Sequence, residues 1–366
     1  MRILIDINHP AHVHYFRNFS KIMKEKGHDI FFVSRNKEMA HRLLELYGFT
    51  YADRGKGKNG KWGKIYYLFY ANIRLLALAR KIKPDLFLNF LHPYPSQVAK
   101  LLGKVSLVFS DTEHATLHHR LTLPFATKIF TPSCYRISLG KKHVRFPGYM
   151  ELAYLHPNYF MPNPDVLQIM GLEEDEKFVL LRFVSWEAAH DFGHTGMSLE
   201  NKRKAVATLS KYARVFISSE AELPPDLEKY RIDIPFDRIH DALYYCSLLF
   251  GESATMASEA AVLGTPSIFM DNDGRGYTDE EERRFGLVNN FTESQEDQFS
   301  AIARAVAILS DPMHKKKYKK KREELLSECI DTTQFMVDEV LKYERTGTYL
   351  RKRAKESVLE ANGNKQ

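Results

Sequence analysis

The sequence predicts an α/β protein with two doubly wound domains, each built on a mainly parallel sheet. Its 366 residues are enough for two such domains, each with its own core. Short apolar stretches alternate with helical stretches in both halves of the chain. Each half also contains one strand–turn–helix–strand unit, at 3–33 and at 248–270, which is how a parallel sheet is built.

In the first half, a strand at 3–7 leads through a loop at 8–14 into a helix that ends near Gly27. Further elements are expected at 29–33 (strand), 37–47 (helix), 50–52 (strand), 65–80 (helix), 85–90, 105–110 and 128–131 (strands). The glycine-rich dinucleotide fingerprint does not follow the first strand, which argues against a nicotinamide or flavin cofactor.

In the second half, strands are expected at 178–183, 215–218, 248–250, 267–270 and 287–289, and the chain is expected to be helical from about 295 to 343. The turn-rich stretches 146–157 and 161–164 predict a linker between domains. We therefore expect an N-terminal domain at 1–157, a C-terminal domain at 158–343 and a flexible tail at 344–366.

Composition indicates a globular protein of a reducing compartment. The chain is 44% hydrophobic and 27% charged, and its three cysteines are too far apart in sequence to suggest a disulfide framework or a zinc site. No targeting signal and no apolar run of membrane-spanning length is recognised. A cytoplasmic location is expected.

The net charge of +7 is concentrated in two basic stretches, 54–61 and 315–322. Such stretches attract phosphates, acidic lipids or nucleic acid without distinguishing them. The first precedes the aromatic, leucine-rich helix at 65–80. Core packing explains that helix most simply, and docking on the inner face of an anionic membrane is the alternative.

The stretch 251–266 predicts an anion site. Small and hydroxyl residues lie between a strand and a helix, where free backbone N–H groups and the helix dipole favour a phosphate. Glu259 follows one turn into that helix among apolar residues. A sugar hydroxyl pair is one partner for such a carboxylate, and exposure on the outer face of the helix is the alternative.

Two groups of residues in the first half are candidates for proton transfer. His9, His12 and His14 share the loop after the first strand, and imidazole is the side chain most easily poised as a base near neutral pH. Helix capping and metal binding are the other roles considered. Asp111 and Glu113 follow another strand, so Asp111 is expected to orient His12.

The second domain adds a loop after its first strand. There Arg182 or Ser185 could contact a phosphate, Trp186 could stack, and His190-Asp191 forms either a second acid/base pair or a helix cap. Asp271-x-Asp273 follows a later strand, where a turn or a sugar contact is the better interpretation.

The stretch 251–266 resembles the nucleotide-sugar signature of GT-B glycosyltransferases and UDP-N-acetylglucosamine 2-epimerases. The resemblance implies a diphosphate at Ser253, Thr255 and Met256, a ribose at Glu259, and helix closure by Gly264 and Pro266. It also implies a phosphate-contacting loop at Arg182 and Ser185. The 2-epimerase pattern is similar around Glu113 and at 130–133.

Five motifs together resemble an uncharacterised archaeal and bacterial domain-of-unknown-function family of this superfamily; they lie at 6–14, 110–113, 148–157, 186–191 and 251–266. The resemblance implies a GT-B fold, with two facing Rossmann-like domains and a C-terminal helical segment.

The expected activity is that of a metal-independent glycosyltransferase of polysaccharide or lipid-linked glycan synthesis. It would need no cofactor beyond its UDP-sugar or other nucleotide-sugar donor, and its catalytic residues would be His12, Asp111, Glu113 and His9. A nucleotide-sugar epimerase or hydrolase is the first alternative. A non-catalytic polyanion-binding protein is the second, although interleaved aromatic residues typical of nucleic-acid readers are not evident.

Overall fold

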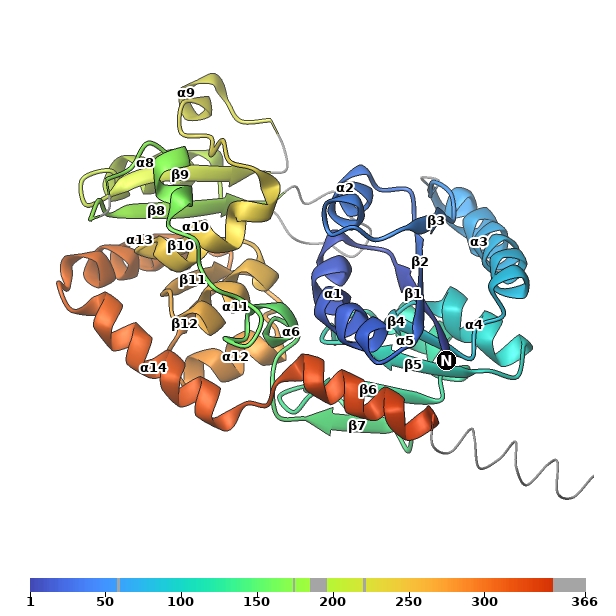
Figure 1. Ribbon diagram of the computed structural model, residues 1–366. Helices are drawn as coiled ribbons and strands as arrows, with labels where there is room; N and C mark the ends of the chain where they lie inside the picture. The colour runs from blue at the N-terminus through green and yellow to red at the C-terminus, as the bar shows by residue number, and fades with distance from the viewer. Residues whose placement is uncertain (58–59, 174, 185–195, 220–221, 345–366) are drawn as a thin grey trace, which may run out of the picture. The chain divides into compact units, whose positions relative to one another are not determined.

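The computed structural model describes residues 1–57, 60–173, 175–184, 196–219 and 222–344, and its helices and strands form two compact units (Figure 1). The first unit comprises residues 1–109, 118–130 and, at the end of the described chain, 331–344. The second comprises residues 110–117 and 131–330. The chain therefore leaves the first unit and returns to it more than once. A single linker between two domains would be crossed only once.

The first sheet has the strand order β3-β2-β1-β4-β5-β6-β7. Its strands are β1 (Arg2–Ile7), β2 (Asp29–Ser34), β3 (Tyr51–Asp53), β4 (Leu86–Phe90), β5 (Val105–Phe109), β6 (Lys128–Pro132) and β7 (His143–Phe146). β1 pairs in parallel with β2 on one side and β4 on the other, so the winding direction reverses between β1 and β4. In doubly wound sheets, ligands bind at the carboxyl ends of the strands beside such a reversal. β7 was not expected from the sequence.

Helices of the first unit follow the apolar periodicity of the sequence. They are α1 (Pro10–Glu25), α2 (Glu38–Leu46), α3 (Gly60–Ile82), α4 (Pro93–Leu101), α5 (Thr116–Thr122), whose first two residues are counted with the second unit, and a helical segment at 332–344. Gly27 ends the first helical stretch in the left-handed region, with φ +82°, as expected.

The aromatic helix α3 has two different faces. Leu75 and Ala79 are buried in a cluster with Leu4 and Phe87. The opposite face leaves Tyr66, Phe69 and Ile73 between 53% and 67% exposed. Core packing therefore explains one face of the helix, and the other face is an exposed apolar surface. Among the described helices, none is both long and apolar enough to cross a membrane.

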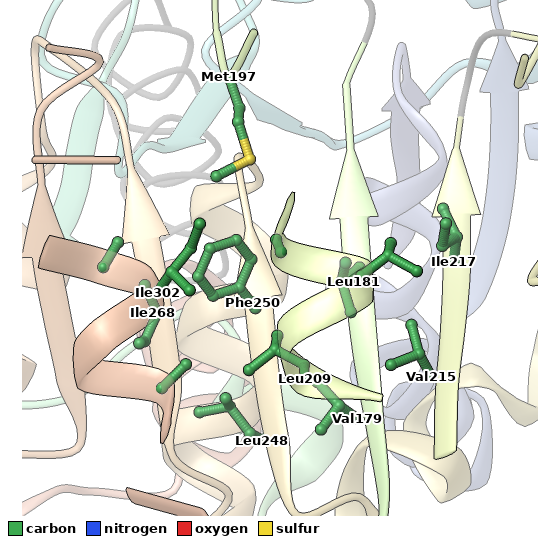
Figure 2. Close-up of a cluster of buried hydrophobic side chains, with 14 of the residues drawn as sticks. Val179, Leu181, Met197, Leu209, Val215, Ile217, Leu248, Phe250, Ile268 and Ile302 are labelled. Atoms are coloured by element: carbon green, nitrogen blue, oxygen red, sulfur yellow. The ribbon is translucent and has the colours of Figure 1, made fainter. Parts of the chain in front are cut away.

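The second sheet has the order β12-β11-β10-β8-β9. Its strands are β8 (Phe178–Phe183), β9 (Arg214–Ser219), β10 (Leu248–Gly251), β11 (Ser267–Met270) and β12 (Val288–Phe291), within two residues of the predicted bounds. Neighbouring strands pair in parallel throughout. Phe250 and Ile268 pack with Leu181 in the core on one face of this sheet (Figure 2).

Helices of the second unit are α6 (Leu152–Leu155), α7 (Asp165–Ile169), α8 (Leu199–Leu209), α9 (Pro225–Glu228), α10 (Ile239–Tyr245), α11 (Ala254–Leu263), α12 (Gly276–Arg283), α13 (Gln295–Ser310) and α14 (His314–Glu328), with one 3-10 turn, η1 (Phe236–Arg238). The turn-rich stretch expected as a linker is largely interior, because residues 149–155 are all buried in this unit.

Both basic stretches prove to be partly structural. Arg54 is fully buried and donates to both carboxylate oxygens of Asp6, at 2.9 and 3.1 Å. On α14, Arg322 donates to the carbonyl of Val262 at 2.8 Å and thereby satisfies a carbonyl at the end of α11. Exposed lysines remain on α14, so the polyanion-attracting surface there is smaller than the sequence suggests.

Candidate functional site

The first turn of α11 is the place where the sequence predicts an anion site. Ser253 caps the helix, its hydroxyl accepting the N–H of Met256 at 3.4 Å. Residues 253–255 reach the surface while residues 256–263 are buried, so the helix presents only its positive end to solvent. The preceding strand ends at Gly251, where an added Cβ would lie 2.1 Å from the carbonyl of Arg182. Only glycine allows β8 and β10 to meet there.

Glu259 is held in place by two side chains from other helices of the second unit. The phenol of Tyr154 on α6 donates to Oε1 at 2.5 Å, and Nε2 of His240 on α10 lies 3.0 Å from the same oxygen. The residue is 6% exposed, so the outer-face alternative is wrong. Because both contacts fall on Oε1, Oε2 is available for a ligand hydroxyl.

The side chains that flank this turn have defined roles. Glu252 accepts the backbone N–H groups of Val184 at 2.9 Å and Met197 at 2.5 Å, so its carboxylate is already satisfied beside the first turn of α11. Arg182 lies opposite Gly251 in the sheet and donates to the hydroxyl of Ser218 at 2.9 Å. Of the other predicted residues in this region, Ser185, Trp186, His190 and Asp191 lie outside the described residues.

Three buried carboxyl side chains and one buried phenol lie in the same unit. We call these residues the acidic cluster: Asp111, Glu151, Glu281 and Tyr277. Each is at most 7% exposed, and Glu151 and Glu281 are at most 1% exposed. Ser258, the neighbour of Glu259 on α11, donates to Oε1 of Glu281 at 2.6 Å. Within the described chain, Oε1 of Glu151 and Oε2 of Glu281 have no hydrogen-bond partner. Buried oxygens of this kind call for a proton or a ligand.

Burial shifts the pKa of each carboxyl in the acidic cluster upward. Desolvation raises the pKa of Asp111 to about 6, although the Thr112 hydroxyl, which donates to it at 2.8 Å, opposes the shift. Desolvation also raises the pKa of Glu281 to about 8, and it raises that of Glu151 well above its ordinary value, with Asp111 adding to the effect. At neutral pH Asp111 is therefore mostly ionised and able to accept a proton, while Glu151 and Glu281 hold protons.

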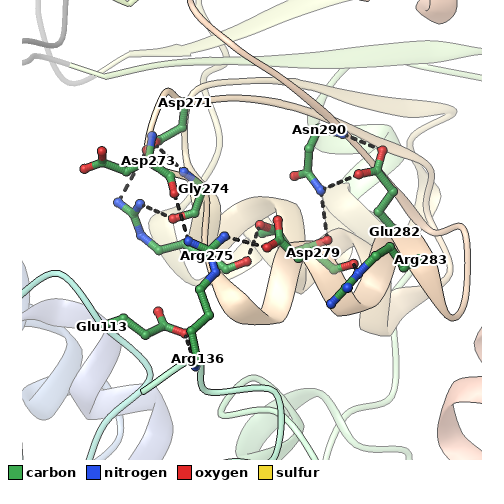
Figure 3. A network of polar contacts seen from close by, with 11 residues as sticks. Glu113, Arg136, Asp271, Asp273, Gly274, Arg275, Asp279, Glu282, Arg283 and Asn290 are labelled. Atoms are coloured by element: carbon green, nitrogen blue, oxygen red, sulfur yellow. Dashed lines mark hydrogen bonds and ion pairs between the residues drawn. The ribbon is translucent and has the colours of Figure 1, made fainter. Parts of the chain in front are cut away.

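Glu113 lies in a polar network at the start of α12 (Figure 3). Its Oε1 accepts the backbone N–H of Arg136 at 3.3 Å. An added Cβ on Gly276 would lie 2.4 Å from the same oxygen, so glycine is required for Glu113 to approach α12. The guanidinium of Arg136 bonds the Asp273 carbonyl at 3.0 Å and the Asp279 carboxylate at 2.5 Å. Glu113 is thus fixed against the loop before α12.

The Asp271-x-Asp273 stretch forms a turn. Oδ1 of Asp271 accepts the backbone N–H groups of Asp273 at 2.6 Å and Gly274 at 3.0 Å. The other oxygen lies 3.4 Å from Arg275. The Asp271 carboxylate therefore interacts with its own loop and stabilises a turn, which is one of the two roles expected. In the described parts of the chain, no group of three or more His, Cys, Asp and Glu side chains has metal-binding geometry.

The predicted histidines lie in the first unit, after β1. The loop expected at 8–14 is shorter, because α1 begins at Pro10, so His12 and His14 lie on the helix and His9 is its cap. Nδ1 of His9 accepts the N–H of Ala11 at 3.3 Å and caps α1. His12 is 8% exposed and packs its ring on Phe90, with 4.9 Å between centroids. Burial lowers the pKa of His12 well below 6.5, and His9 adds to this, so the ring is neutral. Nδ1 accepts a long bond, 3.4 Å, from the N–H of Asn8, which favours the proton on Nε2.

The predicted catalytic residues are thus divided between the units. His9 and His12 belong to the first, and Asp111 and Glu113 to the second. Pairing of His12 with Asp111 stays a prediction. Within the second unit, Asp111 and Glu281 lie near enough to Glu151 to raise the pKa of its carboxyl further.

Sequence reasoning missed several residues of the site: Glu151, Tyr154, His240, Tyr277 and Glu281. Glu151 and Tyr154 lie in the turn-rich stretch taken as a linker, although its apolar residues were a signal of burial. Glu281 lies in a run of charged residues, which usually marks a solvated helix face.

A family described as "Protein of unknown function (DUF354)" matches residues 1–345. The chain belongs to this family. It is 26% identical over 280 residues to an uncharacterized protein of Methanocaldococcus jannaschii, a match that covers 73% of this chain and 80% of that protein. The family expected from the sequence motifs is therefore confirmed.

Solved structures with the same fold come from two enzyme classes. The UDP-GlcNAc 2-epimerase of Neisseria meningitidis, bound to UDP-GlcNAc, matches with a TM-score of 0.66 and 12% identity, over 93% of this chain and 100% of that one. The spinosyn rhamnosyltransferase SpnG in complex with thymidine diphosphate matches with a TM-score of 0.61 and 14% identity, over the same shares. These similarities confirm the GT-B fold class.

Proposed function

We propose that this protein is a metal-independent glycosyltransferase that uses a nucleotide-sugar donor. The observation that carries the proposal is Glu259: a buried carboxylate one turn into a helix whose capped, partly exposed N-terminus suits a diphosphate. Tyr154 and His240 fix Oε1 and thereby aim Oε2, which is the geometry needed to accept ribose hydroxyls.

The donor diphosphate would bind at the first turn of α11, beside Ser253 and Thr255. Charge develops on this group when the bond between the sugar C1 and the diphosphate oxygen breaks and the diphosphate leaves with the electron pair. Fixed backbone dipoles at the helix end stabilise that charge without reorganising.

Asp111 is the proposed general base. It would remove the proton of the acceptor hydroxyl as the acceptor oxygen bonds to C1, and a pKa of about 6 suits a base working near neutral pH. Glu151 and Glu281, which hold protons at that pH, would keep negative charge from accumulating around Asp111. His12 is the other candidate base; its Nε2 proton suits it better to donate a hydrogen bond.

A nucleotide-sugar epimerase or hydrolase is the second candidate. The acidic cluster favours it, because epimerisation needs acid and base groups on opposite faces of the sugar and several carboxyls here have raised pKa values. Incubation with a nucleotide sugar alone separates the two candidates, since an epimerase or hydrolase turns over without an acceptor.

The acceptor is proposed to be a glycan precursor at a membrane surface. The exposed face of α3, with Tyr66, Phe69 and Ile73, is the surface that supports this placement. A purely polyanion-binding protein would instead bind any polyanion with steep salt dependence and would be unaffected by Glu259→Gln.

A thermal-shift screen of nucleoside diphosphates and nucleotide sugars tests the proposal most directly. A selective ligand raises the melting temperature by mass action. A smaller shift in Glu259→Gln, with the full shift kept in Glu296→Gln on the exposed first turn of α13, would support the proposed site. If no nucleotide in the screen raises the melting temperature, the proposal is wrong.

A further inference from the structure

A second group of polar residues lies in the first unit, at the carboxyl ends of its strands. Arg35 follows β2, Arg54 follows β3, and Asn89 and His92 lie at the end of β4. Arg35 and Arg54 lie over the ring of Tyr67, and Arg54 and His92 lie against the ring of Tyr94. We call these six residues the basic edge.

The basic edge carries more positive than negative charge. Both carboxylate oxygens of Asp6 accept hydrogen bonds from Arg54, so Asp6 neutralises Arg54 and not Arg35. Nε of Arg35 is buried and has no hydrogen-bond partner within the described chain. The guanidinium carbon of Arg35 lies 5.6 Å from the ring centre of Tyr67. A half-buried guanidinium without a carboxylate is the group that proteins use to bind phosphates and carboxylates.

Two side chains at the end of β4 each have one further buried atom without a partner, and one of them, His92, is near enough to Arg35 for the guanidinium to lower its pKa. Asn89 is fully buried; its Oδ1 accepts the N–H of His92 at 3.0 Å, while its Nδ2 has no partner within the described chain. His92 is 8% exposed, and its Nδ1 likewise has none there. Its ring stacks on Tyr94 at 5.3 Å, and Tyr94 in turn lies 4.8 Å from the guanidinium carbon of Arg54. Buried polar atoms of this kind are costly unless a ligand satisfies them. Nδ2 of Asn89 is a donor, and Nδ1 of the neutral His92 ring is a donor in the tautomer that carries its proton there.

The backbone holds these donors in position. The N–H of Arg35 donates to the carbonyl of Ile7 at 2.9 Å, which fixes Arg35 at the end of β1. Leu91, between Asn89 and His92, has φ +38°, an unusual value for leucine that turns the chain sharply after β4. The surroundings of His92 are also positively charged. Burial is the main cause that lowers the pKa of His92, and nearby basic side chains lower it further: Arg54, His118, His12 and Arg35.

We propose that the basic edge binds a phosphate group, with Arg35, Asn89 Nδ2 and His92 Nδ1 as donors. Resting on the proposed function, this inference makes the acceptor substrate phosphate-bearing: a soluble sugar phosphate or a lipid phosphate. Arg54, paired with Asp6, adds positive charge and contacts the rings of Tyr67 and Tyr94.

Phosphate binding by the full-length chain tests the inference. Inorganic phosphate is titrated by calorimetry in the presence of the nucleoside diphosphate that the thermal-shift screen selects, so that the α11 site is occupied. Arg35→Gln is expected to weaken phosphate binding about tenfold or more. Arg80→Gln, an exposed arginine at the end of α3, is the matched control and is expected to bind as the parent does.

Gly57→Ala provides a second variant that keeps the charge. An added Cβ there would lie 2.1 Å from Nη2 of Arg35, so the guanidinium must move and phosphate binding should weaken several-fold. The inference is overturned if the parent binds no phosphate, or if Arg35→Gln and Gly57→Ala both bind it within twofold of the parent. Melting temperatures equal to that of the parent would show that the variants are folded.

The source of the phosphate is decided by two further probes. Hexose 1-phosphate represents the soluble source, and phosphatidylcholine vesicles containing a polyprenyl phosphate represent the lipid source. Binding of either that depends on Arg35 supports the site; binding of neither overturns its assignment to the acceptor. If no nucleoside diphosphate binds, the proposed function is wrong. The phosphate titration is then repeated without nucleotide, and its result still tests the phosphate site.

Discussion

The phenol of Tyr154 donates to Oε1 of Glu259 at 2.5 Å, across 105 residues of sequence. This contact and the 3.0 Å approach of His240 determine which carboxylate oxygen can meet a ligand.

Glu259→Gln should therefore weaken nucleoside diphosphate binding about tenfold, because an amide accepts ribose hydroxyls less strongly than a carboxylate does. Calorimetry with the selected nucleotide and with its 2′-deoxy analogue gives the measurement. The parent should discriminate between the two nucleotides and the variant should not. Equal discrimination by both proteins would argue against a ribose contact.

Tyr154→Phe tests whether the contact positions Glu259. The phenylalanine keeps the packing and removes the donor, so the melting temperature should fall only slightly while nucleotide affinity falls several-fold. Tyr66→Phe on the exposed face of α3 is the control and should change neither. An unchanged affinity in Tyr154→Phe would show that His240 alone positions the carboxylate.

Asp111→Asn should abolish turnover, since the amide cannot accept the proton. A carboxyl with a pKa of about 6 is in its basic form above that pH, so kcat/KM of the parent should rise as pH increases through about 6. Thr112→Val removes the hydrogen bond that lowers this pKa, so the rise should move to higher pH. A pH profile that is identical in parent and Thr112→Val would assign the base elsewhere.

Glu281 should make stability depend on pH. Its pKa is about 8 in the folded protein and about 4.5 in the unfolded chain, so between these values the folded state holds the extra proton. The free energy of unfolding should therefore fall as pH rises from about 4.5 to about 8, by a few kcal/mol in order of magnitude. Glu281→Gln keeps an acceptor for Ser258 and should flatten this slope in urea unfolding measured at pH 5, 7 and 9. Glu296→Gln, which is exposed, should leave the slope unchanged.

Arg54→Met should lower the free energy of unfolding by about 3–5 kcal/mol, because it leaves the Asp6 carboxyl buried without its cation. Asp6→Asn combined with Arg54→Met should recover much of this loss. The exposed pair Arg203 and Asp226, at 2.7 Å, is the control, and breaking it should cost at most about 1 kcal/mol. Additive losses in the Asp6/Arg54 double variant would show that the two side chains act independently.

Local signals in the sequence were sufficient for most of the fold. Apolar runs located the strands of both sheets except β7, and Gly27 marked the end of a helical stretch because its left-handed backbone suits glycine. The capped helix that begins after Ser253 was also predictable, since a strand, a small-residue turn and a helix are consecutive there.

Contacts between distant residues could not be predicted in the same way. Arg54 belongs to a run of glycine and lysine that is typical of an exposed loop, and its burial depends on Asp6, 48 residues away. Glu259 was identified as unusual, but its partners Tyr154 and His240 come from separate helices. The raised pKa values of Glu151 and Glu281 depend on burial, which no single stretch of sequence encodes.

The chain passes between the two compact units at 109/110, 117/118, 130/131 and 330/331. A fragment that ends at residue 157 would lack the buried side chains of Met336, Val337 and Val340, which complete the first unit. The amino group of Met1 lies 3.0 Å from His28, and the Glu344 carboxylate lies 3.8 Å from the same ring. Circular permutation that joins residue 344 to Met1 would therefore preserve both units, whereas a single cut after residue 157 would leave an incomplete one.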